Sequence, residues 1–246
     1  MNLSSSTILI TGGSEGIGLA LAERFLKAGS KVIVCGRNQA KLDEVRQAHP
    51  ELSTMVCDVA NEAERVRLFE SVTGDFPKLN VVVNNAGIQR RFQLDQPQDW
   101  PQIQSEIAIN FEAPIHFATL FIAHLAKQEN AAILNVTSGL AFVPSAFAPV
   151  YGATKAAMHS FTMSLRQNLS KLPIEVIEII PPAVNTNLGG AGLHDTGVPL
   201  AEFADAVFAG LEKGQQEVAY GFSQKSSQAS RAELDQVFEQ MNRQMS

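Results

Sequence analysis

Thr7-Ile-Leu-Ile-Thr-Gly-Gly-Ser-Glu-Gly-Ile-Gly18 is the stretch that decides the fold of this chain. Its first five residues are apolar or β-branched, a run typical of a short buried strand. Glycines follow at once, and from Ile17 to Leu26 apolar residues recur at three- and four-residue steps, which indicates a helix. A strand, a glycine-rich turn and a helix in this order favour a turn that lays a pyrophosphate on the helix N-terminus.

Apolar runs of strand length alternate with amphipathic segments along the rest of the chain. The runs are residues 7–11, 31–35, 54–57, 80–84, 132–136, 175–180 and 217–219, and the longest amphipathic segments are 99–127 and 151–172. This alternation predicts an α/β fold in which helices cover both faces of a mostly or fully parallel, seven-stranded sheet. Right-handed crossovers would bring the carboxyl ends of the strands to one edge, where ligands bind.

Length and composition predict a single domain spanning residues 1–246. A chain of 246 residues that is 45% hydrophobic can bury one large core, and no repeat or linker divides it. Residues from about 187 to 215 are expected to form a variable substrate loop or lid, which includes the glycine-rich stretch 189–192. The polar stretch 223–230 is predicted to be a further loop, and residues 230–245 a C-terminal helix.

Charge, hydropathy and cysteine usage exclude several function classes. The formal net charge of −6 argues against a sequence-independent hold on nucleic acid. The sequence has no run of 18 apolar residues and no basic N-terminal leader, so we expect a cytoplasmic protein with no membrane partner. Cys35 and Cys57 each end an apolar run and are predicted to be buried, reduced thiols. No His/Cys cluster has metal-ligand spacing, so no metal site is expected.

Tyr151 and Lys155 are the pair most informative about chemistry. Tyr151 is one of two tyrosines in the chain and stands four residues before the lysine, so on a helix the two side chains share one face. We expect the lysine ammonium to lower the pKa of the phenol, which is about 10 when unperturbed. Ser138, upstream in Asn135-Val-Thr-Ser-Gly139, supplies a hydroxyl that can hold a carbonyl oxygen. The three groups together suit carbonyl reduction or alcohol oxidation.

Several motifs in sequence order resemble those of the short-chain dehydrogenase/reductase family, in its single-domain branch. They are Thr11–Gly18, Asn84-Asn-Ala-Gly87, Asn110, Ser138, Tyr151 and Lys155, and the resemblance covers residues 7 to about 186. The glycine spacing is T-G-x-x-x-G-x-G rather than G-x-G-x-x-G. The resemblance implies a Rossmann-like, doubly wound three-layer sandwich that transfers hydride between a nicotinamide dinucleotide and a small carbonyl or alcohol substrate.

The resemblance also implies roles for individual residues. Ser138 would orient and polarise the substrate carbonyl, and Tyr151 would be the general acid in reduction and the base in oxidation. Lys155 would bind the nicotinamide-ribose hydroxyls and lower the pKa of Tyr151. Asn110 would hold a water that relays protons; the alternative is a helix-interior asparagine that is bonded locally. Pro114 has no N–H to donate to the Asn110 carbonyl, which predicts an interruption of the helix there.

The predicted cofactor-binding residues lie in the glycine-rich turn, after the second, third, fourth and sixth strands, and on the helix of the tyrosine. They are Thr11, Gly12, Ser14, Glu15, Gly16, Ile17, Gly18, Arg37, Asn38, Asp58, Val59, Asn85, Ala86, Gly87, Tyr151, Lys155, Pro181, Val184 and Thr186. Relatives usually have Pro-Gly after the sixth strand, whereas this chain has Pro181-Pro182. Pro182 lacks a donor where the backbone would line the nicotinamide.

The end of the second strand predicts the choice of cofactor. NAD-binding proteins of this fold usually need an acid there to accept from the ribose 2′-hydroxyl, and this chain has Gly36. Arg37 follows, with a guanidinium suited to a 2′-phosphate. Glu15 would oppose that phosphate if it faces the same pocket. We therefore expect NADP(H) to be preferred, with NAD(H) possible.

Substrate class and mode of action are less constrained. Apolar side chains expected at the site favour an apolar ketone or aldehyde; they are Leu140, Phe142, Pro144, Phe147, Leu188 and Leu193. Arg90 and Arg91 could instead bind an anionic group of the substrate, so an anionic substrate is the alternative. A methyltransferase shares a glycine-rich turn but needs no Tyr-x-x-x-Lys. A non-catalytic NADP(H)-binding sensor or scaffold on the same fold would be expected to lose part of the Ser/Tyr/Lys set, which is complete here.

The two longest amphipathic segments and the C-terminal segment predict self-association. Relatives pair the long helices across a two-fold axis, so we expect a homodimer or homotetramer. The C-terminal segment has an apolar stripe at helical spacing, made by Leu234, Val237, Phe238, Met241 and Met245. The alternative for that stripe is docking on its own subunit.

Overall fold

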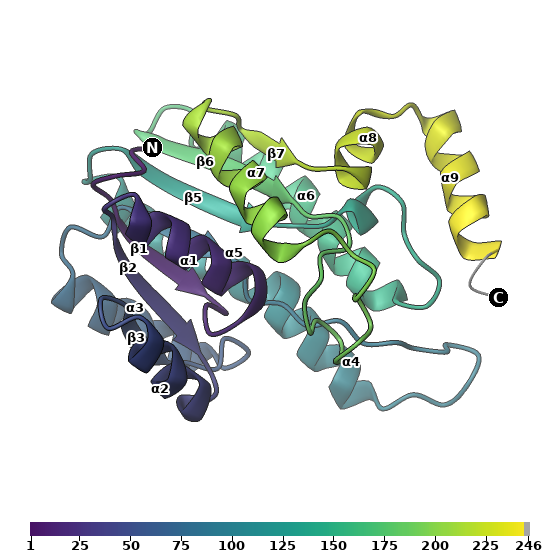
Figure 1. Cartoon of the computed structure of the whole chain (residues 1–246), viewed down its shortest axis with the longest axis horizontal. Coiled ribbons are helices and arrows are strands. Elements are labelled where there is room, and N and C mark those ends of the chain that lie inside the picture. The colour runs from purple at the N-terminus through teal and green to yellow at the C-terminus, as the bar shows by residue number, and fades with distance from the viewer. Residues whose placement is uncertain (244–246) are drawn as a thin grey trace.

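The computed structural model describes residues 1–243 of the chain (Figure 1). In that part of the chain seven strands form one sheet. They are β1 (Thr7–Thr11), β2 (Lys31–Gly36), β3 (Ser53–Val56), β4 (Val81–Asn84), β5 (Ala131–Val136), β6 (Ile174–Ile180) and β7 (Glu217–Ala219). Each strand predicted from the sequence is present, and its bounds differ from the prediction by at most one residue at either end.

The sheet is fully parallel, with the order β3-β2-β1-β4-β5-β6-β7. The strand order reverses between β1 and β4, so the crossovers leave in opposite directions at that point. Ligands bind such sheets beyond the carboxyl ends of the strands at this switch point. The predicted Rossmann-like, doubly wound arrangement is confirmed.

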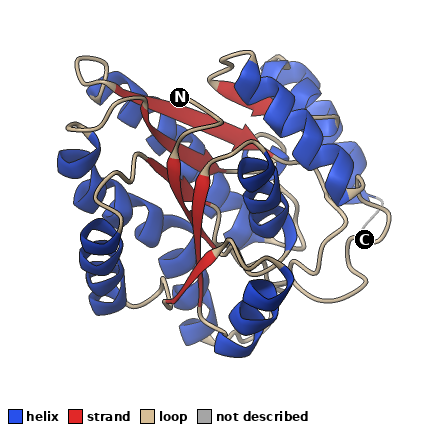
Figure 2. Cartoon of the chain, turned by 60° about the vertical axis from the view of Figure 1, so that its left-hand side comes forward, coloured by secondary structure: helices blue, strands red, loops and turns tan. Residues whose placement is uncertain are grey.

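Helices cover both faces of the sheet (Figure 2). They are α1 (Gly16–Lys27), α2 (Gln39–Ala48), α3 (Glu62–Asp75), α4 (Trp100–Ile107), η1 (Ala108–Glu112), α5 (Ala113–Leu125), η2 (Gly139–Ala141), α6 (Pro149–Asn168), α7 (Leu200–Glu212), α8 (Phe222–Gln228) and α9 (Arg231–Arg243). Alternate strand residues point to opposite faces, so Ile8 and Ile10 join one hydrophobic core while Leu9 joins the other. Phe25 of α1 fills the first core and Phe121 of α5 the second.

The elements α4, η1 and α5 form one continuous helical stretch that contains a π turn, and Pro114 lies two residues beyond the end of this turn. The amide of Ala113 donates to the carbonyl of Ala108, five residues back. Because Pro114 has no N–H, the α-helical bond to the Asn110 carbonyl cannot form, and a widened turn accommodates the missing donor. The interruption predicted at Asn110 is therefore present as a π turn.

This stretch, Trp100–Leu125, is also the one helix among residues 1–243 that is long and apolar enough to span a membrane by length and composition. It packs against α3 and α6 and includes the buried polar residues Glu106 and Asn110. A core helix of a soluble domain passes the same length-and-composition test.

Two loop predictions are corrected by the structure. The polar stretch 223–230 is mostly the helix α8, in which Ser223 and Ser226 are buried and the Ser226 hydroxyl donates to the Phe222 carbonyl (3.0 Å). Serines that pack inward conceal the periodicity that hydrophobic residues would show. The predicted loop or lid of about 187–215 is a loop only to residue 199, because α7 begins at Leu200.

The C-terminal helix is present as α9, which begins with a capping box: Ser230 and Glu233 bond each other reciprocally. On its predicted apolar stripe Leu234, Val237 and Met241 are half-buried, whereas Phe238 is exposed. Met245 of the stripe lies outside the described residues. The stripe is thus covered in part by its own chain.

Candidate active site

The glycine-rich turn after β1 is pressed against the turn after β4. Gly12 has a φ of 64°, and a Cβ there would lie 2.8 Å from the Ala86 Cα. A Cβ at Gly18 would collide with the Gly12 carbonyl oxygen. Asn85 fastens the two turns together, since its Nδ2 donates to the carbonyls of Thr11 (2.9 Å) and Gly12 (3.1 Å). Only glycine fits the closest of these approaches.

The N-terminus of α1 is suited to hold phosphate. Its N-cap residue Glu15 makes no side-chain capping bond, so the helix dipole and first-turn amides are available to an anion. Gly16, at a φ of 57°, starts the helix, and Thr186 lies over it, 3.6 Å from the position of a Cβ at Gly16. Ile17 and Gly18 continue the first turn. The segment after β6 therefore covers the predicted phosphate site.

The predicted 2′-phosphate pocket contains an ion pair that sequence analysis missed. Lys41 Nζ lies 2.7 Å from the Glu15 carboxylate, and both side chains are partly exposed. Arg37 is exposed at the start of this region, while the Asn38 side chain caps α2 by accepting from the Lys41 amide (3.2 Å). Ser14 lies against Gly36, with its Oγ 3.3 Å from where a Cβ would stand. The position of Lys41, four residues after Arg37, was the available signal.

The turn after β3 is held rigidly by residues of α3. The Asp58 amide donates to the Glu64 carboxylate (2.7 Å), and the Asp58 carboxylate accepts from the Ala60 amide (3.0 Å). Arg65, nearly fully buried, donates to the Val59 carbonyl (2.7 Å) and pairs with a carboxylate on η1. Sequence reasoning missed this buried arginine, which positions the predicted adenine contacts.

Ser138, Tyr151 and Lys155 come together beyond the carboxyl end of β5. All three side chains are buried, and the Ser138 hydroxyl acts on the Tyr151 phenol in the direction that lowers its pKa. Lys155 Nζ donates to the Val136 carbonyl at 2.8 Å and lies 5.6 Å from the centre of the Tyr151 ring. A hydroxyl, a phenol and an amine thus converge at the edge where the sheet binds ligands.

The electrostatics of this group correct one prediction. Burial raises the pKa of Tyr151 to about 12, the Glu106 charge also raises it, and the Ser138 hydrogen bond acts in the opposite direction. Burial lowers the pKa of Lys155 to about 8. The expected lowering of the Tyr151 pKa is wrong for this structure, because desolvation of the buried phenol dominates and raises the pKa.

Asn110 uses its side chain to hold the turn after Gly87. Its Nδ2 donates to the Ile88 carbonyl (2.8 Å), and its Oδ1 accepts from the Ile88 amide (2.9 Å). A Cβ at Gly87 would lie 3.5 Å from Asn110 Oδ1 and 3.7 Å from Lys155 Nζ. The asparagine therefore lies beside the lysine, but its amide is engaged locally. A water relay would have to use its main-chain carbonyl, in the π turn.

The segment after β6 covers the site. The Pro181 carbonyl accepts from the Gly139 amide (2.9 Å), and buried Val184 pairs with Val198 in an isolated bridge. In the following loop, His194 Nε2 lies 3.2 Å from Gln89 Oε1, so the loop touches the turn after β4. This contact was missed from the sequence because the two residues are far apart along the chain.

The apolar residues expected at the site do not all face it in the same way. The Phe142 ring packs against His159 at a tilt of 59°, with ring centroids 4.6 Å apart, and the Arg91 guanidinium lies 5.0 Å from the centre of the Phe147 ring. Leu140 and Leu188 are half-buried, whereas Leu193 is exposed. Helix α8 adds contacts that sequence reasoning missed, since Phe222 and Ser223 pack against Gly139, next to Ser138.

Glu106 is a further buried residue that the sequence did not single out. It precedes Asn110 by one helical turn, is 0% exposed, and neither carboxylate oxygen has a well-placed donor among the described residues. Arg90 Nη1 is 3.8 Å from its Oε2. Burial raises the pKa of Glu106 to about 7, against the opposing effect of Arg90. Its spacing from Asn110 was the available signal.

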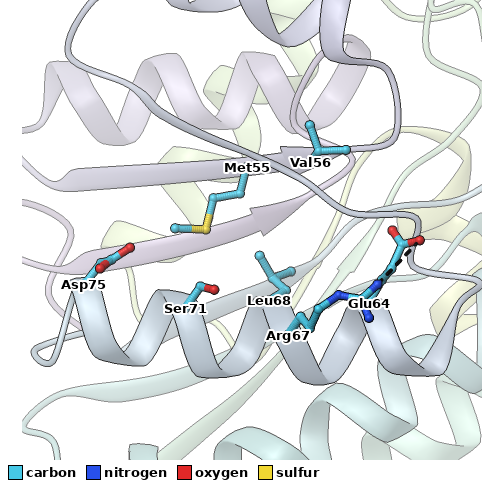
Figure 3. Close-up of a pocket in the computed structure, with 7 residues that line it drawn as sticks. All are labelled: Met55, Val56, Glu64, Arg67, Leu68, Ser71 and Asp75. Atoms are coloured by element: carbon cyan, nitrogen blue, oxygen red, sulfur yellow. Dashed lines mark ion pairs between the residues drawn. The ribbon is translucent and has the colours of Figure 1, made fainter.

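A surface hollow lies elsewhere, away from these residues. It has a volume of about 380 Å³ and lies between β3 and α3, where Figure 3 shows its lining side chains: Met55, Val56, Glu64, Arg67, Leu68, Ser71 and Asp75. None of the predicted catalytic residues lines it. Its relation to the site is indirect, through Glu64, which bonds the Asp58 amide.

Comparison with known proteins identifies the family. The description "short chain dehydrogenase" matches residues 6–195, more than half of the chain. The chain belongs to this family. The resemblance found in the sequence is confirmed, and the protein is an NAD(P)-dependent oxidoreductase.

The similarity to individual relatives covers nearly the whole length of this dehydrogenase. It is 45% identical over 250 residues to "Uncharacterized oxidoreductase DltE" of Bacillus subtilis, with 99% of each chain covered. A short chain dehydrogenase from Burkholderia cenocepacia, solved with NADP, superposes with a TM-score of 0.83 at 25% identity over 98% of this chain and 99% of that one. A 3-ketoacyl-(acyl-carrier-protein) reductase from Brucella melitensis, solved with NADH, superposes with a TM-score of 0.80 at 26% identity. The superposition covers 90% of this chain and 99% of that one.

The cysteines of the dehydrogenase are both free and buried, as predicted. Cys35 lies near the end of β2, and Cys57 follows β3 directly. Across residues 1–243 there is no group of three or more His, Cys, Asp and Glu side chains placed to hold a metal ion.

Proposed function

We propose that this oxidoreductase uses NADPH to reduce an apolar ketone or aldehyde, with Ser138, Tyr151, Lys155 and Asn110 as its catalytic residues. The observation that supports this most is the convergence of the buried Ser138, Tyr151 and Lys155 side chains, with Lys155 Nζ 5.6 Å from the centre of the Tyr151 ring. With its raised pKa, Tyr151 keeps its proton at neutral pH and can donate it.

The reaction divides between the cofactor and the chain. A nicotinamide dinucleotide supplies the hydride when bound. Ser138 donates a hydrogen bond to the substrate oxygen, which polarises the carbonyl, and Tyr151 transfers its proton to that oxygen as negative charge develops there. Lys155, held at the Val136 carbonyl, would bind the nicotinamide-ribose hydroxyls with its remaining N–H donors. The Asn110 clamp on Ile88 maintains the backbone beside the lysine.

The turns fit a dinucleotide. A Cβ at Gly12 or Gly18 would fill the narrow approach between the turns after β1 and β4, and the α1 N-terminus has no side-chain cap. These features suit a pyrophosphate. The adenine end would contact Asp58 and Val59.

Charge at the end of β2 supports NADPH over NADH. Solved relatives of similar identity hold NADP or NADH, so local residues rather than the fold decide the choice. Gly36 offers neither an acceptor for a 2′-hydroxyl nor a repelling charge. Arg37 and Lys41 supply cations, and the opposing Glu15 is already paired with Lys41. A 2′-phosphate would compete with Glu15 for Lys41.

An apolar substrate is favoured over an anionic one because both candidate arginines are engaged. Arg90 donates to the Gln102 carbonyl (3.0 Å) and faces Glu106, while Arg91 lies over Phe147. Leu140 and Leu188 then provide the apolar surface near the site.

A substrate screen tests the proposal. NADPH absorbance is followed with apolar ketones and aldehydes, and with matched carboxylated analogues as the control set. We expect the protein to reduce the apolar set, and we expect Tyr151→Phe to abolish this turnover. Tight NADPH binding without turnover on any carbonyl would instead indicate a sensor, and a preference for the carboxylated set would reassign Arg90 and Arg91.

A further inference from the structure

The chain between Ser138 and Tyr151 folds back onto the helix that carries the tyrosine. We call residues 139–148 the connecting segment. A Cβ at Gly152, the residue after Tyr151, would lie 3.5 Å from Pro144 Cβ and 3.6 Å from the Leu140 carbonyl oxygen. Pro144 therefore packs on α6 next to the tyrosine, and the path of the connecting segment decides which of its side chains come near the phenol.

Neighbouring elements hold the two ends of the connecting segment. At its start, Phe222 and Ser223 of α8 pack against Gly139. Near its end, the Phe92 amide donates to the Phe147 carbonyl (3.2 Å). Between these contacts, Pro144 and Ala146 are exposed. An exposed stretch of loop backbone is free to move unless another group bonds it.

Asn242, close to the end of α9, bonds this exposed middle. Its Oδ1 accepts from the Ala146 amide (2.7 Å), and its Nδ2 donates to the Pro144 carbonyl (3.3 Å). The same Nδ2 donates to the Phe238 carbonyl (2.9 Å), one turn earlier on α9, which orients the side chain on its own helix. The partners in the connecting segment are 96 and 98 residues away along the chain.

The chemistry of this contact suits an amide side chain. It joins the carbonyl of one residue and the N–H of the second residue after it, as a neighbouring strand would. A single side chain can do this only if it carries both a donor and an acceptor on one planar group, which asparagine and glutamine do. A carboxylate has no donor for Pro144, and an ammonium has no acceptor for Ala146.

Helix α9 is held to the molecule without a deep apolar contact. None of its residues 231–243 is fully buried, and it forms the yellow end of the chain in Figure 1. Burial of its half-covered apolar stripe does not fix which backbone groups it meets, because apolar contacts are not directional. The two bonds from Asn242 are directional, and they fix α9 against the connecting segment.

We propose that Asn242 is a positioning residue for substrate binding, which holds the connecting segment in the conformation that receives the carbonyl substrate. A segment that is ordered before binding loses less conformational entropy when the substrate binds. Asn242 therefore acts on KM. It leaves the chemical step alone, because the Lys155–Val136 bond fixes the catalytic groups separately. The link to a substrate rests on the proposed function, whereas the ordering of the segment does not.

Hydrogen exchange at the Ala146 amide, followed by NMR in the full chain, tests the ordering without a substrate. Asn242→Ala removes the acceptor of this amide, and Gln240→Ala is the matched control, since it removes an exposed amide side chain from the same turn of α9. Exchange should become about 10-fold faster in Asn242→Ala and stay unchanged in the control. Equal exchange in Asn242→Ala and the unaltered protein would overturn the proposal.

Steady-state kinetics test the role in binding, with NADPH and the carbonyl that the unaltered protein reduces best. In Asn242→Ala the KM for the carbonyl should rise by about 10-fold, while kcat, NADPH affinity and the Gln240→Ala kinetics change little. Faster exchange with an unchanged KM would make the contact merely structural and overturn this inference alone. A lack of turnover by the unaltered protein would refute the proposed function, and this inference with it.

Discussion

The Lys155 ammonium donates a hydrogen bond to the Val136 carbonyl at 2.8 Å, which ties α6 to the end of β5. Val136 is two residues before Ser138, and Tyr151 is one turn before Lys155 on α6. One bond therefore braces the strand that precedes the serine against the helix of the tyrosine. Side chains locked in this way hold a reactive arrangement before any ligand binds.

Replacing Tyr151 with Phe removes the proposed proton donor and keeps the ring volume. Turnover in the reductive direction should fall by about 10²-fold or more, because general-acid catalysis contributes on this scale. NADPH affinity, measured by fluorescence titration, should change little. Near-normal turnover in this variant would refute the assignment of Tyr151.

Two substitutions in the cofactor pocket should change the NADPH affinity in opposite directions. Arg37→Ala should weaken NADPH binding by about 10-fold or more and leave NADH binding nearly unchanged, since a charge-assisted contact is worth about 1.5–3 kcal/mol. Glu15→Gln should strengthen NADPH binding, because it frees Lys41 from its 2.7 Å ion pair. Calorimetric titration of both cofactors measures each effect. Tighter binding of NADH than NADPH by the unaltered protein would contradict the NADP(H) preference.

Burial of Glu106 predicts a pH-dependent stability. Its folded pKa of about 7 lies above the ordinary value of 4.5, so the folded state holds this proton more tightly than the unfolded state. The contribution is fully present below pH 4.5 and is lost as pH rises through 7, by about 2–4 kcal/mol. Urea unfolding at acid and mildly alkaline pH should show this loss in the unaltered protein relative to Glu106→Met. Parallel pH profiles for the two proteins would show that Glu106 titrates normally.

Exposed apolar side chains on the long helices support the expected homodimer or homotetramer. Trp100 and Ile107 of α4 and Met163 of α6 are 59%, 37% and 52% exposed. Light scattering should give a mass that is a multiple of the 26.6 kDa chain mass. The Met163→Glu variant should have a measured mass closer to that of a single chain. Phe238→Glu tests the second candidate surface, on α9, in the same way. A mass near 26.6 kDa for the unaltered protein at micromolar concentration would rule out a stable oligomer.

Strands, the glycine-rich turn and the long helices could be predicted because their signals are local. A run such as Val81–Asn84 is apolar throughout, and a parallel strand covered on both faces requires that composition. Pro114 interrupts its helix through its own missing N–H, which needs no knowledge of the rest of the fold. Helix α8 escaped prediction because its buried face is made of serines, whose burial depends on the neighbouring η2.

The sequence by itself determined the sheet, the turn that approaches a pyrophosphate, and the presence of Ser138, Tyr151 and Lys155 at family spacing. Tertiary structure decided the pKa values and the ion pairing of the site residues. It raised the Tyr151 pKa where spacing to Lys155 had predicted the opposite, and it paired Glu15 with Lys41. Spacing along one helix is set by local geometry, whereas desolvation and ion pairing depend on groups brought together from distant parts of the chain.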